Sequence, residues 1–166
     1  MKIVIDVHYE NDAASAAGVL FSAWTDPAPL ASVRCAREGL ADYEPGQFYK
    51  RELPVILDLL QRIEDPLDTI VIDGYVHLGP EARAGLGQHL WSALEQRVAI
   101  IGVAKNRFVG TPAESELLRG KSAKPLFVTA VGVDLDEAKR AIAAMHGEHR
   151  LPTLLKLVDQ LCRQSV

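Results

Sequence analysis

Three acidic residues and a lysine stand where their side chains can act on one ligand. Residues Thr69–Asp73 form a short apolar run that ends in an acid and is followed by Gly74, which predicts a buried strand of a parallel sheet. Asp73 then lies at the carboxyl end of that strand, the edge at which open α/β sheets hold their ligands. A desolvated carboxylate costs free energy unless a positive group meets it. Asp73 is therefore either a residue that turns the following loop or a ligand for a metal ion.

Asp6 is the second acid. It lies in the middle of the alternating, β-branched run 2–9, which predicts the first strand of the chain. Acids are depleted in strand interiors, so the position needs a reason. A hydrogen-bonded structural role is one explanation, and a place beside the acid of the later strand is the other.

Glu52 is the third acid and stands at the start of a predicted helix. It precedes Val55, Ile56 and Leu59 by three, four and seven positions, so it shares their core-facing side. An acid in a first helical turn also interacts well with the helix dipole, which is the structural alternative. The core-facing position favours a role in a site, because an acid that only caps a helix is more often exposed.

Asp6, Glu52 and Asp73 together predict a metal site. Converging carboxylates repel one another and raise their own pKa values unless a divalent cation lies among them. Hard oxygen ligands of this kind suit Mg²⁺, with Mn²⁺ as a substitute. The chemistry that such a site permits is metal-assisted hydrolysis of a phosphodiester. Lys105, at the carboxyl end of the predicted strand 98–103, can neutralise charge on the reacting phosphate.

The elements that must position these residues follow one another clearly along the chain. Three strand-like runs joined by turn signals, at 2–9, 14–23 and 30–36, predict an antiparallel meander. The later expected elements are a helix to about residue 63, the strand 69–73, a helix opened by Pro80 and ending at Leu94, the strands 98–103 and 125–131, and helices at 134–145 and 152–162. This order is that of ribonuclease H-like folds. We therefore expect an α/β mixed sheet flanked by helices, with the first and fourth strands side by side.

Composition limits the number of domains and the class of protein. The 166 residues are 48% hydrophobic and 24% charged, which suits one domain, residues 1–166, with a sizeable core. A net charge of −4 gives no general attraction to nucleic-acid backbones, which disfavours a non-specific binder but not an enzyme with a local metal site. No apolar run is long enough to span a membrane. Cys35 and Cys162 lack metal-site spacing and Asp6 interrupts any signal-peptide core, so we expect a cytoplasmic protein.

Short motifs along the chain resemble those of a known nuclease family. They are Asp6-Val7-His8-Tyr9, Tyr43-Glu44-Pro45-Gly46, Arg51-Glu52-Leu53-Pro54, Val71-Ile72-Asp73-Gly74 and Ile101-Gly102-Val103-Ala104-Lys105, and near the end Arg150-Leu151-Pro152 with Asp159. In this order they are similar to the endonuclease V family, metal-dependent nucleases that act at deoxyinosine in DNA and at inosine in RNA. The resemblance covers nearly the whole chain.

The resemblance implies roles for individual residues. Asp6, Glu52 and Asp73 are expected to be metal-binding catalytic acids, and Lys105 is expected to face the phosphate. Tyr43, Pro45 and Gly46 are expected to form a wedge that replaces an extruded base in DNA or RNA with a modified base. An aromatic ring on a rigid proline turn can fill a vacated stack at a low cost in entropy.

The chain also departs from the family pattern. Gly79-Pro80-Glu81 stands where the family has a His-Pro-Arg run, and residues 130–133 lack the histidine of a Ser-x-Gly-His motif. Lys156 replaces an arginine, and we expect the family's amino-terminal helical extension to be absent, since the chain starts at the first strand. These departures define an alternative function, a catalytically impaired or repurposed member that binds nucleic acid or protein. A third reading is hydrolysis or phosphoryl transfer on another substrate.

Overall fold

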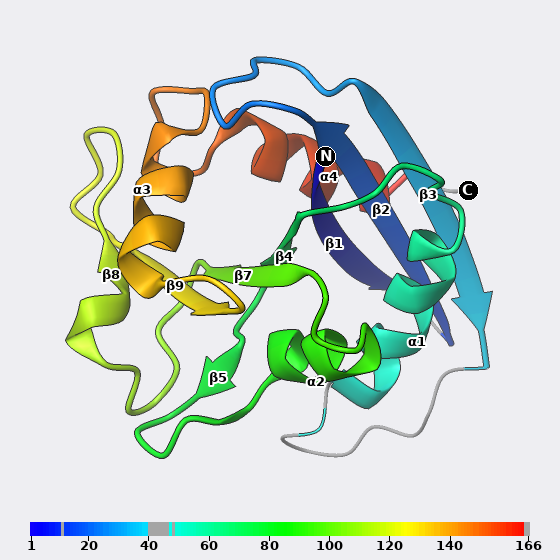
Figure 1. Ribbon diagram of the computed structural model, residues 1–166, viewed down its shortest axis with the longest axis horizontal. Helices are drawn as coiled ribbons and strands as arrows, with labels where there is room; N and C mark the ends of the chain where they lie inside the picture. The colour runs from blue at the N-terminus through cyan, green and yellow to red at the C-terminus, as the bar shows by residue number, and fades with distance from the viewer. Residues whose placement is uncertain (11, 40–46, 48, 165–166) are drawn as a thin grey trace.

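A seven-stranded mixed sheet forms the centre of the molecule (Figure 1). A computed structural model describes residues 1–10, 12–39, 47 and 49–164. The strands are β1 (Lys2–Glu10), β2 (Ala13–Phe21), β3 (Ala31–Glu38), β4 (Thr69–Asp73), β7 (Ala99–Ala104), β8 (Glu116–Leu117) and β9 (Leu126–Val131), in the spatial order β3-β2-β1-β4-β7-β9-β8. The helices are α1 (Tyr49–Leu60), α2 (Leu86–Ala93), α3 (Leu135–Ala144) and α4 (Thr153–Cys162), with a short 3-10 turn η1 (Ala113–Ser115). This arrangement confirms the expected fold class.

The pairing of strands brings two of the acids together. β1, β2 and β3 form the expected antiparallel meander, and β1 pairs with β4 in parallel. Ile5 lies opposite Ile72 in that pairing, so the next residues, Asp6 and Asp73, leave neighbouring strands at the same edge. β4 also pairs in parallel with β7, whose carboxyl end leads to Lys105. The expected adjacency of the first and fourth strands is therefore confirmed.

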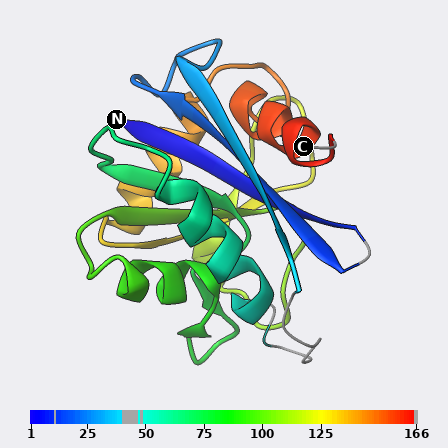
Figure 2. The same cartoon turned by 90° about the vertical axis from the view of Figure 1, so that its right-hand side faces the viewer.

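Two hydrophobic cores lie on opposite faces of the sheet, because side chains alternate along each strand. The face covered by α1 and α2 is built mainly from Ile3, Ile5, Ile70, Ile72 and Ile100. The face covered by α3 and α4 is built mainly from Val4, Val71, Ile101, Val103 and Val128. Figure 2 shows α4 on the other side of the sheet from α1 and α2. Asp6 and Asp73 follow Val4 and Val71 by two positions, so they continue the α4 face beyond the end of the core.

The segment that follows β4 packs tightly against β7 beside the site. A Cβ atom on Gly102 would lie 2.6 Å from the carbonyl oxygen of Gly74 and 2.7 Å from the Thr129 hydroxyl oxygen. That hydroxyl accepts a hydrogen bond from the backbone N–H of Val76 at 2.8 Å. The segment that follows Asp73 therefore lies directly on the backbone of β7.

The predicted helix from Pro80 to Leu94 is wrong in its first part. A two-stranded hairpin, β5 (His77–Leu78) with β6 (Arg83–Ala84), precedes α2, and the helix begins only at Leu86. Gly79 and Ala82 have φ angles of +71° and +49°, which a right-handed helix does not allow. The N–H of Gly85 donates to the carbonyl of Val76 at 2.8 Å and delays the helix start. Within the described part of the chain, no helix is long and apolar enough to cross a membrane.

Candidate active site

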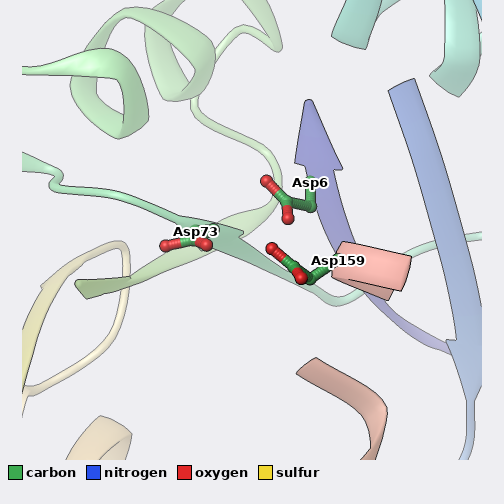
Figure 3. Close-up of side chains that lie close together, drawn as sticks. All are labelled: Asp6, Asp73 and Asp159. Atoms are coloured by element: carbon green, nitrogen blue, oxygen red, sulfur yellow. The ribbon is translucent and has the colours of Figure 1, made fainter. Parts of the chain in front are cut away.

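Three aspartates meet at the carboxyl edge of the sheet. Asp6 comes from β1, Asp73 from the end of β4, and Asp159 from the last turn of α4 (Figure 3). One carboxylate oxygen of each lies within 4.8 Å of the others. The backbone N–H of Val7 donates to Asp6 Oδ1 at 2.8 Å and fixes that side chain. Among the residues that the structure describes, Glu52 is not a member of this cluster.

Two cations contact the cluster from different elements. Lys105 Nζ lies 2.6 Å from Asp73 Oδ2 and 3.4 Å from Asp159 Oδ1. Arg163 Nη2 lies 3.1 Å from the same Asp159 oxygen. Although burial opposes it, the contact with Asp73 holds the pKa of Lys105 above its ordinary value, so the ammonium stays charged. The sequence placed Lys105 at this edge, and its pairing with two of the acids comes from the structure.

The electrostatic balance of the cluster is uneven. Burial, followed by the charge of Asp73, raises the pKa of Asp6 to about 6, against the opposing effects of the Val7 hydrogen bond and of Lys105. The hydrogen bond from Arg163 holds the pKa of Asp159 below its usual range. Asp6 is thus the acid with the least compensating positive charge, and an added cation would favour its ionised form.

Glu52 approaches the site from the other face of the sheet. It lies on α1 and lines a narrow space with Asp6 and Asp73. Burial raises the pKa of Glu52 to about 7; the Tyr9 hydroxyl opposes this rise, and the charges of Asp6 and Asp73 add to it. Burial and the charge of Glu52 in turn raise the pKa of Tyr9, which keeps the phenol protonated. The predicted packing of the Glu52 helix near Asp6 and Asp73 agrees with this placement, while its role as a metal ligand stays a prediction.

The three aspartates fit a small divalent cation. Oxygens that share a Mg²⁺ ion lie roughly 3 to 4 Å apart, because each is about 2.1 Å from the metal. The oxygens of the cluster are within 4.8 Å of one another before any ion draws them in. All of these donors are carboxylate oxygens, which suit a hard cation. The buried Cys162 thiol beside Asp6 adds no thiolate, because burial and the charges of Asp6 and Asp159 raise its pKa to about 12.

A cavity of about 280 Å³ opens beside the acids. The residues that line it include the acids Glu52 and Asp73 and the aromatic residues Tyr49, Tyr75 and Phe108. The Tyr75 hydroxyl donates to the carbonyl of Asn106 at 2.8 Å and accepts from the N–H of Phe108 at 3.1 Å. The Tyr75 and Phe108 rings meet edge to face with centroids 6.2 Å apart. This wall is therefore fixed by hydrogen bonds to the loop that follows Lys105.

Other predicted site residues have different outcomes. Tyr43, Pro45 and Gly46 lie outside the described residues. Asp159 matched a closing motif but was not assigned to the site by sequence. A usable signal was present, because Asp159 lies four residues after Leu155 and one after Val158, both buried, just as Glu52 lies among apolar positions.

The mixed sheet, with its antiparallel meander, its parallel β1-β4-β7 strands and its acids at one edge, is a ribonuclease H-like fold. A family model described as Endonuclease V matches residues 3–126. The chain is 32% identical to the endonuclease V of Streptomyces avermitilis over 98% of its own length and 79% of that protein. It belongs to the endonuclease V family.

Solved structures agree with this assignment. The crystal structure of endonuclease V from Streptomyces avermitilis matches with a TM-score of 0.75 and 31% identity, over 97% of this chain and 78% of that one. The Ciona intestinalis endonuclease V, solved with a 24mer DNA containing an inosine followed by a ribo-adenosine, matches with a TM-score of 0.78. That match has 20% identity and covers 98% of this chain and 84% of the other, so it supports the fold.

Proposed function

We propose that this protein is a metal-dependent endonuclease that hydrolyses a phosphodiester near deoxyinosine, inosine or another modified base in DNA or RNA. The observation that carries the proposal is the cluster of Asp6, Asp73 and Asp159 at the sheet edge with Lys105 against it. Membership of the endonuclease V family supports the same reaction. The Ciona intestinalis relative was solved with inosine-containing DNA, which supports the substrate class.

The aspartates are proposed to hold Mg²⁺, or Mn²⁺ in its place. When bound, such an ion stabilises negative charge on the reacting phosphate and lowers the pKa of a water molecule. Asp73 and Asp159 present oxygens that Lys105 already contacts, so the ammonium is held at the same edge as the acids. From there it can neutralise charge that develops on a phosphate oxygen. Glu52 is proposed to assist from the α1 side, as a ligand directly or through water.

The cavity beside Asp73 is proposed to receive the modified base. Its volume, about 280 Å³, is just below the range for small-molecule sites, about 300–1,000 Å³. Flat aromatic walls suit a nucleobase, since stacking on aromatic side chains tolerates any base face. A base that enters here leaves the stack of the duplex, and that step is where we propose the wedge role of Tyr43, Pro45 and Gly46.

Cleavage of labelled oligonucleotides tests this proposal. Single- and double-stranded DNA and RNA with and without inosine would be incubated with Mg²⁺ or Mn²⁺ and each protein. We expect inosine-dependent nicking by the wild type and a loss of at least about 100-fold in Asp73→Asn and Asp159→Asn. Glu64→Gln removes an exposed acid outside the cluster and serves as the control.

Three other outcomes would contradict the proposal. Binding of inosine strands without nicking, by protein shown to be folded, would support the binding-module alternative. Nicking that Asp73→Asn leaves intact would identify a contaminating nuclease. Nicking of undamaged strands at the same rate would reject the specificity for a modified base.

A further inference from the structure

Arg163 lies at the edge of the acid cluster, on the side of α4. It is the C-cap residue of that helix, four positions after Asp159, and its side chain is 55% exposed. Its Nε and Nη2 atoms approach Asp159 Oδ2 and Oδ1 at 3.4 and 3.1 Å. Since a guanidinium has five N–H donors, this pairing leaves donors that face away from Asp159.

His8 meets the outer part of the same guanidinium. Its Nδ1 atom lies 3.4 Å from Arg163 Nη1. His8 follows Asp6 by two positions on β1, so it extends the same face of the strand past the acids. This contact ties the guanidinium, which stays half-exposed, to the first strand beside the cluster.

Arg163 and Lys105 hold the same oxygen from two elements. Lys105, which follows β7, lies 3.4 Å from Asp159 Oδ1, and Arg163 lies 3.1 Å from it. The two cations are therefore close enough to reach oxygens of one phosphate or of adjacent phosphates. Apart from Glu52, the three aspartates outnumber these two cations by one charge, and a divalent ion would offset that excess. The resulting site attracts a singly charged phosphodiester.

We propose that Arg163, oriented by His8, is a second phosphate-binding residue that holds the nucleic-acid backbone on the α4 side of the cluster. This proposal rests on the proposed function, since it assigns the path of the same substrate strand. Arg163 contacts the backbone and no base, so it contributes affinity equally for inosine-containing and unmodified strands. Its planar fork suits two oxygens of a phosphate.

Salt-dependent binding tests this assignment. Asp73→Asn, which we expect to prevent turnover, would be the background, and fluorescence anisotropy would report the binding of labelled single-stranded DNA in Mg²⁺ between about 50 and about 200 mM salt. Adding Arg163→Gln should make the slope of log K against log salt shallower by about 0.7, the value for one phosphate contact on a single strand. As salt rises from about 50 to about 200 mM, the affinity of Asp73→Asn divided by that of the double variant should therefore fall by about threefold. This fall should be the same for strands with and without inosine.

Arg97→Gln is the matched control, because it removes the same charge from an arginine that is 77% exposed and precedes β7, at the opposite end of that strand from the site. It should leave the slope within error of the background, and Arg163→Lys should retain the background slope. Equal slopes for Arg163→Gln and Arg97→Gln would overturn the role of Arg163 and leave the proposed function standing. Failure of the folded background protein to bind any strand would overturn both the inference and the proposed function. A slope lowered by Arg163→Gln, together with a wild type that nicks no strand, would uphold the role of Arg163 and reject the nuclease.

Discussion

Asp6 and Glu52 are acids that the fold keeps in a costly environment. Burial is the main cause in both cases, and the charge of Asp73 adds to it, so the pKa of Asp6 rises to about 6 and that of Glu52 to about 7. Their ordinary values are 3.8 and 4.5. A fold that needed these acids only for its own stability would place them where cations or water meet them. Their positions therefore point to a bound cation.

The raised pKa of Asp6 predicts a pH-dependent stability. The folded protein binds this proton more tightly than the unfolded chain, so the stability that Asp6 contributes falls as pH rises from about 4 to about 6 and stays low above that. The shift corresponds to about 3 kcal/mol at most. Without divalent ions, Asp6→Asn should therefore raise the free energy of unfolding at pH 8 and have little effect at pH 4. Urea unfolding of both proteins with a chelator at the two pH values measures this.

Asp68 offers a matched control with the opposite sign. Although partial burial opposes it, hydrogen bonds from the amino terminus and Thr69 hold its pKa below the usual range. Asp68→Asn should therefore lower stability slightly at pH 8. If Asp6→Asn changes the free energy of unfolding equally at pH 4 and pH 8, the ionisation of Asp6 is not the source of the pH dependence.

At the level of secondary structure, the pairing of β4 with β7 positions the residues of the site. These strands deliver Asp73 and Lys105 to one edge, and Gly102 lets the segment after Asp73 lie on the β7 backbone. The same segment contains Tyr75, whose hydroxyl forms hydrogen bonds with the loop after Lys105. The separation of these backbones thus sets the relative positions of the acid, the lysine and the cavity wall.

Gly102→Ala should damage activity more than stability. The added Cβ meets backbone atoms that cannot turn aside, so the segment after Asp73 must shift. We expect a loss of about 1 to 3 kcal/mol in the free energy of unfolding and a fall in nicking rate of at least about tenfold at a temperature where the protein is folded. Ile101→Val, a truncation one residue earlier on the α4 face, should cost about 1 kcal/mol with near-normal nicking. Equal rates in the two variants would contradict this reading of Gly102.

Across the whole molecule, the acid cluster joins the two ends of the chain. Asp6 comes from the first strand, Asp73 from the middle, and Asp159 from the last helix, which packs against β1 and β2. The unfolded chain has no such site, so a bound ion stabilises only the folded state. A metal ion held by the cluster would therefore couple its binding to the global stability.

Divalent ions should raise the melting temperature. At about one hundred times the dissociation constant, one bound ion adds about 2.7 kcal/mol, which corresponds to roughly 5 to 10 °C for a protein of this size. Thermal unfolding with increasing Mg²⁺ or Mn²⁺ would measure the rise, and Asp159→Asn should abolish most of it. Glu64→Gln should respond as the wild type does. An equal rise in Asp159→Asn would place the ion away from the cluster.

The sequence by itself determined the fold class and two of the three aspartates of the cluster. The strand patterns and their order fixed Asp6 and Asp73 on adjacent strands, because parallel neighbours end at the same edge of a sheet. Lys105 followed from the same rule applied to β7. These predictions depend on local periodicity and chain order, which a single sequence contains. The hairpin before α2 was missed, since the contact of Gly79 with the loop at Val109 and the hydrogen bond from Gly85 to Val76 override the helical pattern.

Only the tertiary structure decided which residues complete the site. Asp159 and Arg163 lie on a helix whose angle and position on the sheet depend on how Leu154, Leu155 and Val158 pack against β1 and β2. Glu52 faces the core as its helical spacing required, but its helix covers the opposite face, so it reaches Asp6 and Asp73 from the other side. Helical periodicity defines which way a side chain points from its helix, and packing between elements defines what it meets.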